Sequence, residues 1–225
     1  MITPYYDHAG ITIFHGDCLE IIPIIGRVDL VLTDPPYGMN LNTDFSAMKI
    51  KMFKGKTGGA SYAPVFGDDC EFDPRPFIDA IKTREQFWFG ADYYADKLPK
   101  GGAWMVWDKR LSESADKMYG SCFETIWSMT PHKRTIYRFK FAGIFGMEKQ
   151  DTRCRLHPTQ KPLALINRIL LDHGKPGQTV FDPYMGSGTT LRAAKDLGRK
   201  AIGIEIEEKY CEIAAKRLSQ EVLPL

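Results

Sequence analysis

Hydrophobic and polar residues follow two spacings along this chain, short apolar runs and longer stretches with helical periodicity. The short runs predict β-strands, because they are rich in β-branched and aromatic residues and end at turn-forming residues; they are Ile11–Phe14, Val28–Thr33, Gln86–Gly90, Ala103–Trp107, Thr125–Ser128, Thr135–Phe141, Thr179–Phe181 and Ala201–Ile204. The periodic stretches predict helices over Leu19–Ile25, Pro76–Lys82, Pro162–Gly174, Thr189–Leu197 and Glu207–Leu218. Since strands and helices alternate over most of the chain, we expect an open, largely parallel α/β sheet.

The middle of the chain departs from this regular alternation. Thr125–Ser128 and Thr135–Phe141 lie close enough in sequence to predict an antiparallel pair of strands. Ser112 is a plausible N-cap for a further helix around Ala115–Met118. Residues 38–64 are rich in glycine, lysine, asparagine and serine, which is typical of a mobile loop.

The length and composition indicate one ordinary globular domain. The chain has 225 residues, of which 44% are hydrophobic and 26% charged. The first residues lack the basic start and apolar core of a signal peptide, and no apolar run approaches the length of a membrane span. The five cysteines form no Cys-x-x-Cys pair, which argues against a zinc site or a disulfide framework and for a reducing, cytoplasmic location.

Positive charge is concentrated in two segments, although the net charge is only +2. Residues 49–56 carry four lysines and no acid, and residues 131–161 carry eight bases against two acids. Such segments on an otherwise acidic chain predict a face that binds a polyanion, the alternative being solvated charge runs. The candidate DNA-phosphate contacts are Lys49, Lys51, Lys54, Lys56, Lys133, Arg134, Arg138, Arg153 and Arg155. The arginines among them are equally suited to reading guanine edges.

A glycine-bearing loop between a strand and a helix predicts a site for a nucleoside-like ligand. The segment 181–190 reads Phe-Asp-Pro-Tyr-Met-Gly-Ser-Gly-Thr-Thr, and glycines let a ligand approach the backbone closely. It matches neither a phosphate-binding loop nor a dinucleotide fingerprint, so the ligand should lack a pyrophosphate. A purely structural turn is the alternative. The next strand ends at Glu205, and a carboxylate there suits the two ribose hydroxyls, although it would also suit the protein surface.

Asp34-Pro35-Pro36-Tyr37 carries the sharpest chemical signal. An exocyclic amino group of a base is a poor nucleophile, because its lone pair is delocalised into the ring. Acceptors such as the Asp34 carboxylate and the Pro35 carbonyl favour a pyramidal, reactive nitrogen, and the prolines fix the backbone that presents them. Tyr37 offers a flat face for a base that is flipped out of the helix. A simple Pro-Pro turn after a strand is the alternative.

Taken in order, these motifs resemble the β class of DNA amino-methyltransferases. His15-Gly16-Asp17-Cys18, Asp34–Tyr37, His157-Pro158-Thr159-Gln160-Lys161-Pro162, Phe181–Thr190 and Gly203-Ile204-Glu205 match motifs of that class along nearly the whole chain. The resemblance implies S-adenosyl-L-methionine as cofactor and a catalytic role for Asp34, Pro35, Pro36 and Tyr37. It implies cofactor binding by Asp17, Cys18, Asp34, His157, Gln160, Lys161, Asp182, Pro183, Gly186, Gly188, Thr189 and Glu205. Lys161 could instead occupy an ordinary position in the first helical turn.

The resemblance also implies a fold and a substrate. The fold is a Rossmann-like class I methyltransferase sheet, circularly permuted because the catalytic motif precedes the cofactor loop, with a small target-recognition insertion within residues 38–156. The substrate is DNA, and a leading Asp favours adenine N6 over cytosine N4. An RNA methyltransferase and a catalytically silent DNA-binding relative are the less favoured alternatives: RNA-modifying relatives usually place the cofactor loop first and carry Asn in place of the Asp, and a silent protein has no use for Asp34 and the cofactor loop together. Members of the class often form dimers, and many are paired with a restriction enzyme. The short chain predicts a short or relaxed recognition sequence.

Overall fold

The computed structural model describes residues 2–44, 61–110, 121–142, 145, 146, 157 and 159–220. Nine strands form one sheet in the order β1-β2-β11-β10-β3-β4-β6-β5-β7. Their bounds are Tyr6–His8 for β1, Ile11–His15 for β2, Leu30–Thr33 for β3, Gln86–Phe89 for β4, Ala103–Asp108 for β5, Phe123–Ser128 for β6, Ile136–Arg138 for β7, Thr179–Asp182 for β10 and Lys200–Glu205 for β11. Two short strands, β8 (Phe141–Ala142) and β9 (Phe145–Gly146), form a separate antiparallel ladder.

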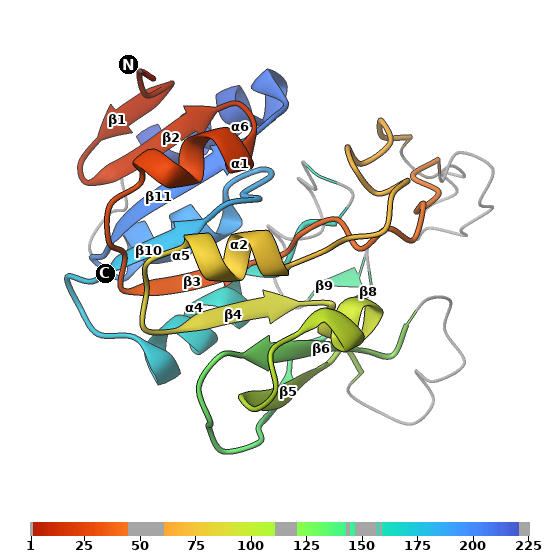
Figure 1. Cartoon of the computed structure of the whole chain (residues 1–225). Helices are drawn as coiled ribbons and strands as arrows, with labels where there is room; N and C mark the ends of the chain where they lie inside the picture. Colours follow the sequence, from red (N-terminus) through yellow and green to blue (C-terminus); the bar gives the residue numbers. More distant parts are fainter. Residues whose placement is uncertain are drawn as a thin grey trace.

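Helices cover both faces of this sheet (Figure 1). One face carries α1 (Cys18–Ile21), the 3-10 turn η1 (Ile22–Ile24) and α2 (Arg75–Ala80), while the other carries α4 (Leu163–His173), α5 (Thr189–Asp196) and α6 (Glu208–Ser219). A longer 3-10 segment, η2 (Ala91–Lys97), follows β4. No helix in the described part of the chain is long and apolar enough to cross a membrane.

The alternation of side chains along the strands produces two apolar layers, one on each face. Leu30 and Leu32 pack with α4, α5 and α6, whereas Val31 packs with α1 and α2. The strand interiors are hydrophobic on both sides because the sheet is covered on both sides. This confirms the predicted α/β architecture with one continuous sheet.

The order of the last strands differs from the sequence prediction. β6 and β7 were expected to pair, but β5 lies between them, antiparallel to β6 and parallel to β7. The prediction was wrong because proximity in sequence favoured a hairpin, while β5 provides the longer partner, with six paired residues along β6. The helix expected around Ala115–Met118, with Ser112 as its cap, lies outside the described residues.

The segment that follows the catalytic motif begins with an anchored turn. The Asp68 carboxylate accepts hydrogen bonds from the backbone amides of Tyr37, Gly38 and Leu41 at 2.7–3.0 Å. Asp68 is a buried residue, so these bonds tie the start of the segment to the body of the domain. The mobility expected for residues 38–64 stays a prediction, since residues 45–60 lie outside the described part of the chain.

Candidate active site

The chemically distinctive segments meet at one edge of the sheet. β2, β11, β10, β3 and β4 all run in the same direction, so their carboxyl ends lie together, at the edge where ligands of open α/β sheets bind. β3 leads into Asp34 and its neighbour β10 leads into the glycine loop. The structure therefore brings the catalytic motif and the cofactor loop together on adjacent strands.

Asp34 follows a strand that is buried along its whole length. The two prolines after it cannot continue a ladder, and β3 ends at Thr33. Asp34 Oδ2 accepts a hydrogen bond from Lys161 Nζ at 2.5 Å, and Asp34 Oδ1 accepts one from the Tyr37 hydroxyl. Each carboxylate oxygen has a second lone pair, and the side chain is 17% exposed. The carboxylate can therefore still accept a hydrogen bond from a substrate.

Glu124, near the start of β6, is a site residue that sequence reasoning missed. Lys161 Nζ lies 3.2 Å from Glu124 Oε2, and the ammonium group of Lys109 pairs with Glu124 Oε1. β6 runs antiparallel to β4 and β5, so its first residues lie where those strands end. The sequence offered no signal for Glu124, because its place depends on the direction in which β6 enters the sheet.

The cluster formed by Asp34, Glu124, Lys161 and Lys109 contains two carboxylates and two ammonium groups. Burial raises the pKa of Asp34 more than Lys161 lowers it, and Glu124 raises it further. Burial also raises the pKa of Glu124, but Lys161 and Lys109 together lower it below its ordinary value. Burial lowers the pKa of Lys161, and the two carboxylates more than offset this, so that it stays protonated at neutral pH.

Tyr37 lies between the catalytic carboxylate and a second tyrosine. Its ring stacks on that of Tyr93, with the centroids 5.0 Å apart and the planes at 9°. A Cβ at Gly90 would lie 2.2 Å from the Tyr37 ring, and Gly90 has a φ of 63°, so only glycine fits there without strain. One face of Tyr37 thus contacts Tyr93, which is itself 47% exposed. Stacking of Tyr37 on a flipped base stays a prediction.

The glycine loop has the backbone that its sequence predicts. Gly186 and Gly188 have φ values of 51° and 77°, in the left-handed region that favours glycine. A Cβ at Gly188 would lie 2.8 Å from the Cβ of Ala214 on α6. The neighbours Pro183 and Thr189 are buried. The glycines therefore allow the loop to pack closely on α6 and then begin α5.

Glu205 fits the role of a ribose acceptor. Its Oε2 accepts a hydrogen bond from the Gly186 amide at 3.0 Å, and its Oε1 accepts one from the Glu207 amide at 2.8 Å. Burial raises its pKa, and no ion pair of Glu205 occurs in the described part of the chain. One lone pair remains on each oxygen, so the carboxylate can hold the loop and still accept two hydroxyl groups.

The N-terminal motif lies against the same loop. Asp17 is exposed and caps α1 by accepting a hydrogen bond from the Leu19 amide at 2.8 Å. Gly16 donates its amide hydrogen to the Glu205 carbonyl at 3.0 Å. Burial raises the pKa of Cys18 to about 11, although its thiol is hydrogen-bonded with Tyr184. Its thiol is therefore neutral and not a nucleophile, and contacts of Asp17 and Cys18 with a cofactor stay predictions.

Asp182 differs from the other carboxylates predicted to bind the cofactor because it is fully buried. It is 3% exposed and accepts hydrogen bonds from the Thr33 hydroxyl at 2.8 Å and from the Tyr184 amide at 3.1 Å. Thr33 directly precedes Asp34, so this bond links the catalytic strand to the loop strand. A direct contact between Asp182 and a cofactor stays a prediction.

The His-Pro-Thr-Gln-Lys-Pro motif reaches both halves of the site. The His157 ring packs edge-on against Tyr210 at 4.4 Å and lies beside Gly186. The Gln160 amide donates to the His157 carbonyl at 3.2 Å, and Lys161 then extends to Asp34. Its ammonium group contacts the catalytic carboxylate, and its role in binding the cofactor stays a prediction. Pro158 lies outside the described residues.

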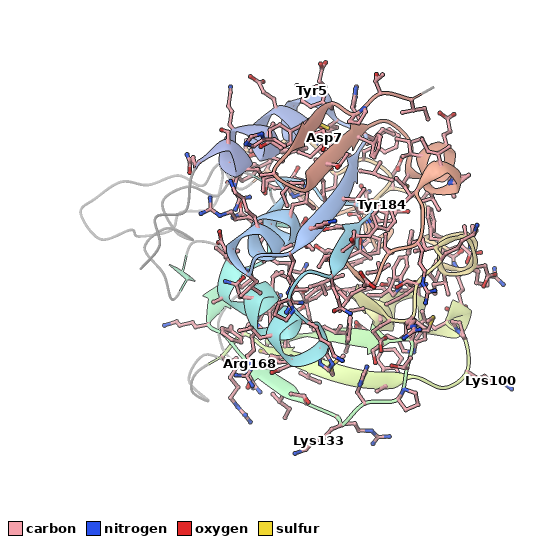
Figure 2. All side chains as sticks on the ribbon, turned by 90° about the vertical axis from the view of Figure 1, so that its left-hand side faces the viewer. Tyr5, Asp7, Lys100, Lys133, Arg168 and Tyr184 are labelled. Atoms are coloured by element: carbon pink, nitrogen blue, oxygen red, sulfur yellow. The ribbon has the colours of Figure 1, made fainter. Side chains whose placement is uncertain are left out.

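Three of the predicted DNA-binding residues are described, and all three are exposed. They are Lys133, Arg134 and Arg138. Lys133 projects from the surface in Figure 2, and Arg138 is 63% exposed, 3.8 Å from Asp108. Lys49, Lys51, Lys54, Lys56, Arg153 and Arg155 lie outside the described residues. Phosphate contacts of the whole set therefore stay a prediction.

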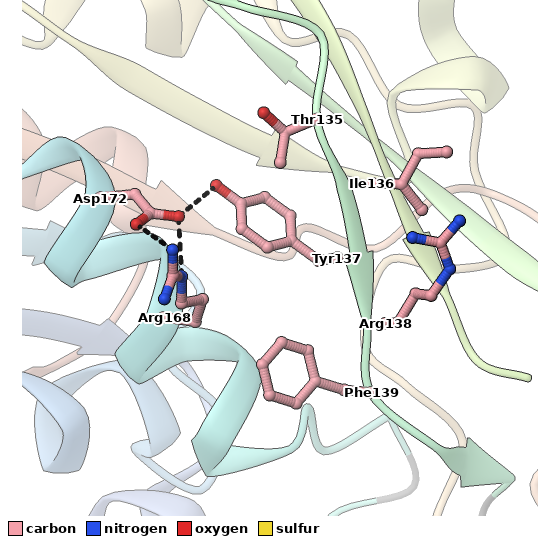
Figure 3. A pocket seen from close by; sticks show the side chains of 7 residues that line it. All are labelled: Thr135, Ile136, Tyr137, Arg138, Phe139, Arg168 and Asp172. Atoms are coloured by element: carbon pink, nitrogen blue, oxygen red, sulfur yellow. Dashed lines mark hydrogen bonds and ion pairs between the residues drawn. The ribbon is translucent and has the colours of Figure 1, made fainter. Parts of the chain in front are cut away.

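A pocket of about 300 Å³ lies between β7 and α4. Its charged groups are mostly paired with one another (Figure 3): Asp172 accepts a hydrogen bond from the Tyr137 hydroxyl at 3.2 Å and forms an ion pair with Arg168 at 2.9 Å. Of the predicted site residues it contains only Arg138. We assign it no catalytic role.

Known proteins resemble this chain in sequence and in fold. The model of the DNA methylase family, which comprises N6 and N4 methyltransferases, matches residues 28–216. A Type II methyltransferase of Streptococcus pneumoniae, M2.DpnII, is 54% identical over 254 aligned positions, which cover 98% of this chain and 94% of that protein. M.HinfI of Haemophilus influenzae, also a Type II methyltransferase, is 29% identical and covers 95% of this chain and 69% of its own length.

Two solved structures extend the comparison to the fold. The PvuII DNA methyltransferase, described as cytosine-N4-specific, superposes with a TM-score of 0.67 at 15% identity, over 98% of this chain and 90% of that one. The M1.HpyAVI–SAM complex superposes with a TM-score of 0.56 at 24% identity, over 93% of this chain and all of the other. At these identities the likeness concerns the fold.

The fold and the sequence define a class I methyltransferase that carries the Asp-Pro-Pro-Tyr motif. The chain belongs to the DNA methylase family, and S-adenosylmethionine is the methyl donor that this membership implies. The order of its motifs, with Asp34 before the glycine loop, is a property of the sequence. That this order arose by circular permutation stays a prediction.

Proposed function

We propose that this protein transfers a methyl group from S-adenosylmethionine to the N6 amino group of adenine in DNA. One observation carries the proposal: the partly exposed carboxylate of Asp34 stands at the end of β3, beside the loop strand β10, with an acceptor free on each oxygen. An amino group that donates a hydrogen bond to this carboxylate becomes more nucleophilic and is held in place for attack.

The cofactor supplies an activated methyl group on a sulfonium centre, and the protein positions it. Glu205 offers acceptors for the ribose, the Gly186–Gly188 loop allows close approach, and Asp17 stands at the adjacent edge. The likeness to a solved complex with SAM supports this arrangement. No covalent enzyme intermediate is needed, since the amine attacks the methyl carbon directly.

The choice of adenine rests on the first residue of the motif. Asp34 favours N6-adenine, whereas N4-cytosine enzymes more often begin the motif with Ser. The fold does not distinguish adenine from cytosine, because the PvuII DNA methyltransferase, which superposes with a TM-score of 0.67, is described as cytosine-N4-specific. N4-cytosine methylation is therefore the second candidate. We also propose that the protein acts in the bacterial cytoplasm; its pairing with a restriction enzyme and its dimerisation stay predictions.

Product analysis tests the proposal. Unmethylated DNA is incubated with the protein and labelled S-adenosylmethionine, digested to nucleosides and analysed by mass spectrometry. We expect N6-methyldeoxyadenosine, and no labelled product with Asp34→Ala. N4-methyldeoxycytidine would transfer the assignment to cytosine, label confined to competing RNA would assign an RNA methyltransferase, and no label at all would leave a silent DNA-binding relative. Long-read sequencing of DNA from expressing cells then gives the recognition sequence.

A further inference from the structure

Glu124 is a partly buried carboxylate for which the site described so far has no use. It lies in β6, and its side chain is 17% exposed. Its two oxygens face two different lysines, Lys161 on the side of the catalytic motif and Lys109 on the other. Two carboxylates and two ammonium groups thus alternate in a chain that runs from Lys109 through Glu124 and Lys161 to Asp34.

Lys161 is shared between the carboxylates at its two sides. Its ammonium group lies 2.5 Å from Asp34 and 3.2 Å from Glu124, and its side chain is only 8% exposed. It also lies 5.2 Å from the centre of the Phe89 ring, which closes the site on a further side. In such a desolvated site a lysine with one carboxylate would pair with that carboxylate alone. Glu124 prevents this exclusive pairing.

Methyl transfer makes a specific demand on Asp34. The target nitrogen forms a bond to the methyl carbon while the carbon–sulfur bond breaks, which turns the sulfonium into a neutral thioether. The nitrogen gains the positive charge and then loses one proton, which a carboxylate can accept and pass to water. Asp34 must therefore be ionised, have an acceptor free, and be basic enough to stabilise the developing charge.

We propose that Glu124 is a positioning residue for methyl transfer, whose negative charge beside Lys161 offsets the charge of that ammonium group and so keeps the Asp34 carboxylate basic and open to the target amine. The proposal rests on the amino-methyl transfer described above and holds for adenine and cytosine alike. Glu124 acts through Lys161 and needs no contact with the substrate. Lys109 keeps Glu124 ionised, because its ammonium group pairs with Oε1, the oxygen that does not face Lys161.

The electrostatic balance of the site supports this role. Burial raises the pKa of Asp34, Lys161 lowers it and Glu124 raises it again. The other titratable groups near Asp34 are the Tyr37 hydroxyl, which donates to it, together with Tyr94 of η2 and Asp182 of β10. All three are neutral when protonated, and each has a raised pKa through burial. The two tyrosines are therefore neutral at neutral pH, whereas Asp182, whose pKa is about 7, is partly ionised there and adds its charge to those of Lys161 and Glu124.

The first experiment compares Glu124→Gln with the wild type in single-turnover methylation from pH 5 to pH 9. Removing the negative charge lowers the pKa of Asp34, so we expect the acid limb of the rate profile to move to lower pH by about one unit. We expect the plateau rate to fall about tenfold, since a less basic carboxylate activates the amine less. The dissociation constants of cofactor and DNA should change less than about twofold, because the proposed role of Glu124 involves no contact with either ligand.

Glu85→Gln is the matched control. Glu85 is also a glutamate with little exposure, 9%, and it pairs with His132 at 2.6 Å. It lies just before β4, at the amino end of that strand, whereas the site lies at the carboxyl end. Its removal should leave the acid limb in place. A limb that stays in place in Glu124→Gln, or moves equally in both variants, would overturn the proposal.

A titration of the wild-type protein avoids any folding defect of the variants. In spectra of protein labelled with ¹³C at the Asp and Glu carboxyl groups, the Asp34 signal is the one that Asp34→Asn removes. We expect Asp34 and Glu124 to titrate as a coupled pair, each with a two-step curve. A single-step curve for Asp34 would refute the coupling. This measurement requires no turnover, so a protein without methyltransferase activity would contradict the proposed function and leave this result intact.

Discussion

Replacing Asp182 with asparagine should change how the stability of this domain depends on pH. The Asp182 carboxyl group is 3% exposed and accepts hydrogen bonds from Thr33 and Tyr184. Burial raises its pKa to about 7, against these hydrogen bonds and one from Thr190, which lower it. An asparagine can accept the hydrogen bonds from Thr33 and Tyr184, which both go to Oδ1, with its carbonyl oxygen, but it does not titrate.

The sign of the effect follows from the raised pKa. The folded protein holds the proton of Asp182 more tightly than the unfolded chain, whose pKa is near 3.8. The stabilisation from this group is therefore complete below about pH 4 and is lost as the pH rises through 7. At about 1.4 kcal/mol per pKa unit, the full range is about 4 kcal/mol, and roughly 2.5 kcal/mol of it falls between pH 5 and pH 8.

Urea unfolding of the cofactor-free protein measures this contribution. The free energy of unfolding is determined for the wild type and for Asp182→Asn at pH 5 and pH 8. The difference between the two proteins cancels the titration of all other groups, provided that they are unaffected. We expect this difference to move by roughly 2.5 kcal/mol in favour of the variant at pH 8. A difference that is constant within about 0.5 kcal/mol would show that Asp182 is ionised at both pH values, and would refute the reasoning.

Four further substitutions have measurable outcomes. Lys161→Met leaves two carboxylates without their shared cation, so it should lower the free energy of unfolding by about 3–5 kcal/mol and move the acid limb of the methylation profile to higher pH; a limb at lower pH would contradict this. Gly188→Ala places a Cβ at a φ of 77° and 2.8 Å from the Cβ of Ala214, which should cost about 1–3 kcal/mol in thermal unfolding, and an unchanged melting temperature would show that the loop relaxes. Lys133→Ala and Arg134→Ala should each reduce the salt dependence of DNA binding by about one unit in fluorescence anisotropy, whereas unchanged slopes would remove these residues from the DNA interface.

The sequence predicted those parts of the site whose geometry is local. Gly186 and Gly188 adopt left-handed backbone angles because glycine has no Cβ. Pro35 and Pro36 end β3 because a proline ring fixes φ and leaves no amide hydrogen for the sheet. The strands of the parallel half were predictable because apolar runs with breakers at their ends are the signature of a covered sheet.

The missed parts depend on relations between distant segments. Glu124 reaches Lys161 because β6 enters the sheet between β4 and β5 in the opposite direction, and no pattern in residues 123–128 reveals that direction. The same choice of partner excluded the expected pairing of β6 with β7. The sequence placed Lys161 in the cofactor motif, and only the three-dimensional structure shows its ion pair with Asp34.

The hydrogen bond between Thr33 and Asp182 spans 149 positions of the chain, and this separation has a consequence for protein synthesis. β3 leaves the ribosome long before β10, the strand that lies next to it in the sheet. At a translation rate of roughly 5–20 residues per second, the catalytic carboxylate waits about 7–30 seconds for its supporting strand. A nascent chain that ends before β10 therefore contains Asp34 but lacks the strand that supports it and the glycine loop beside it.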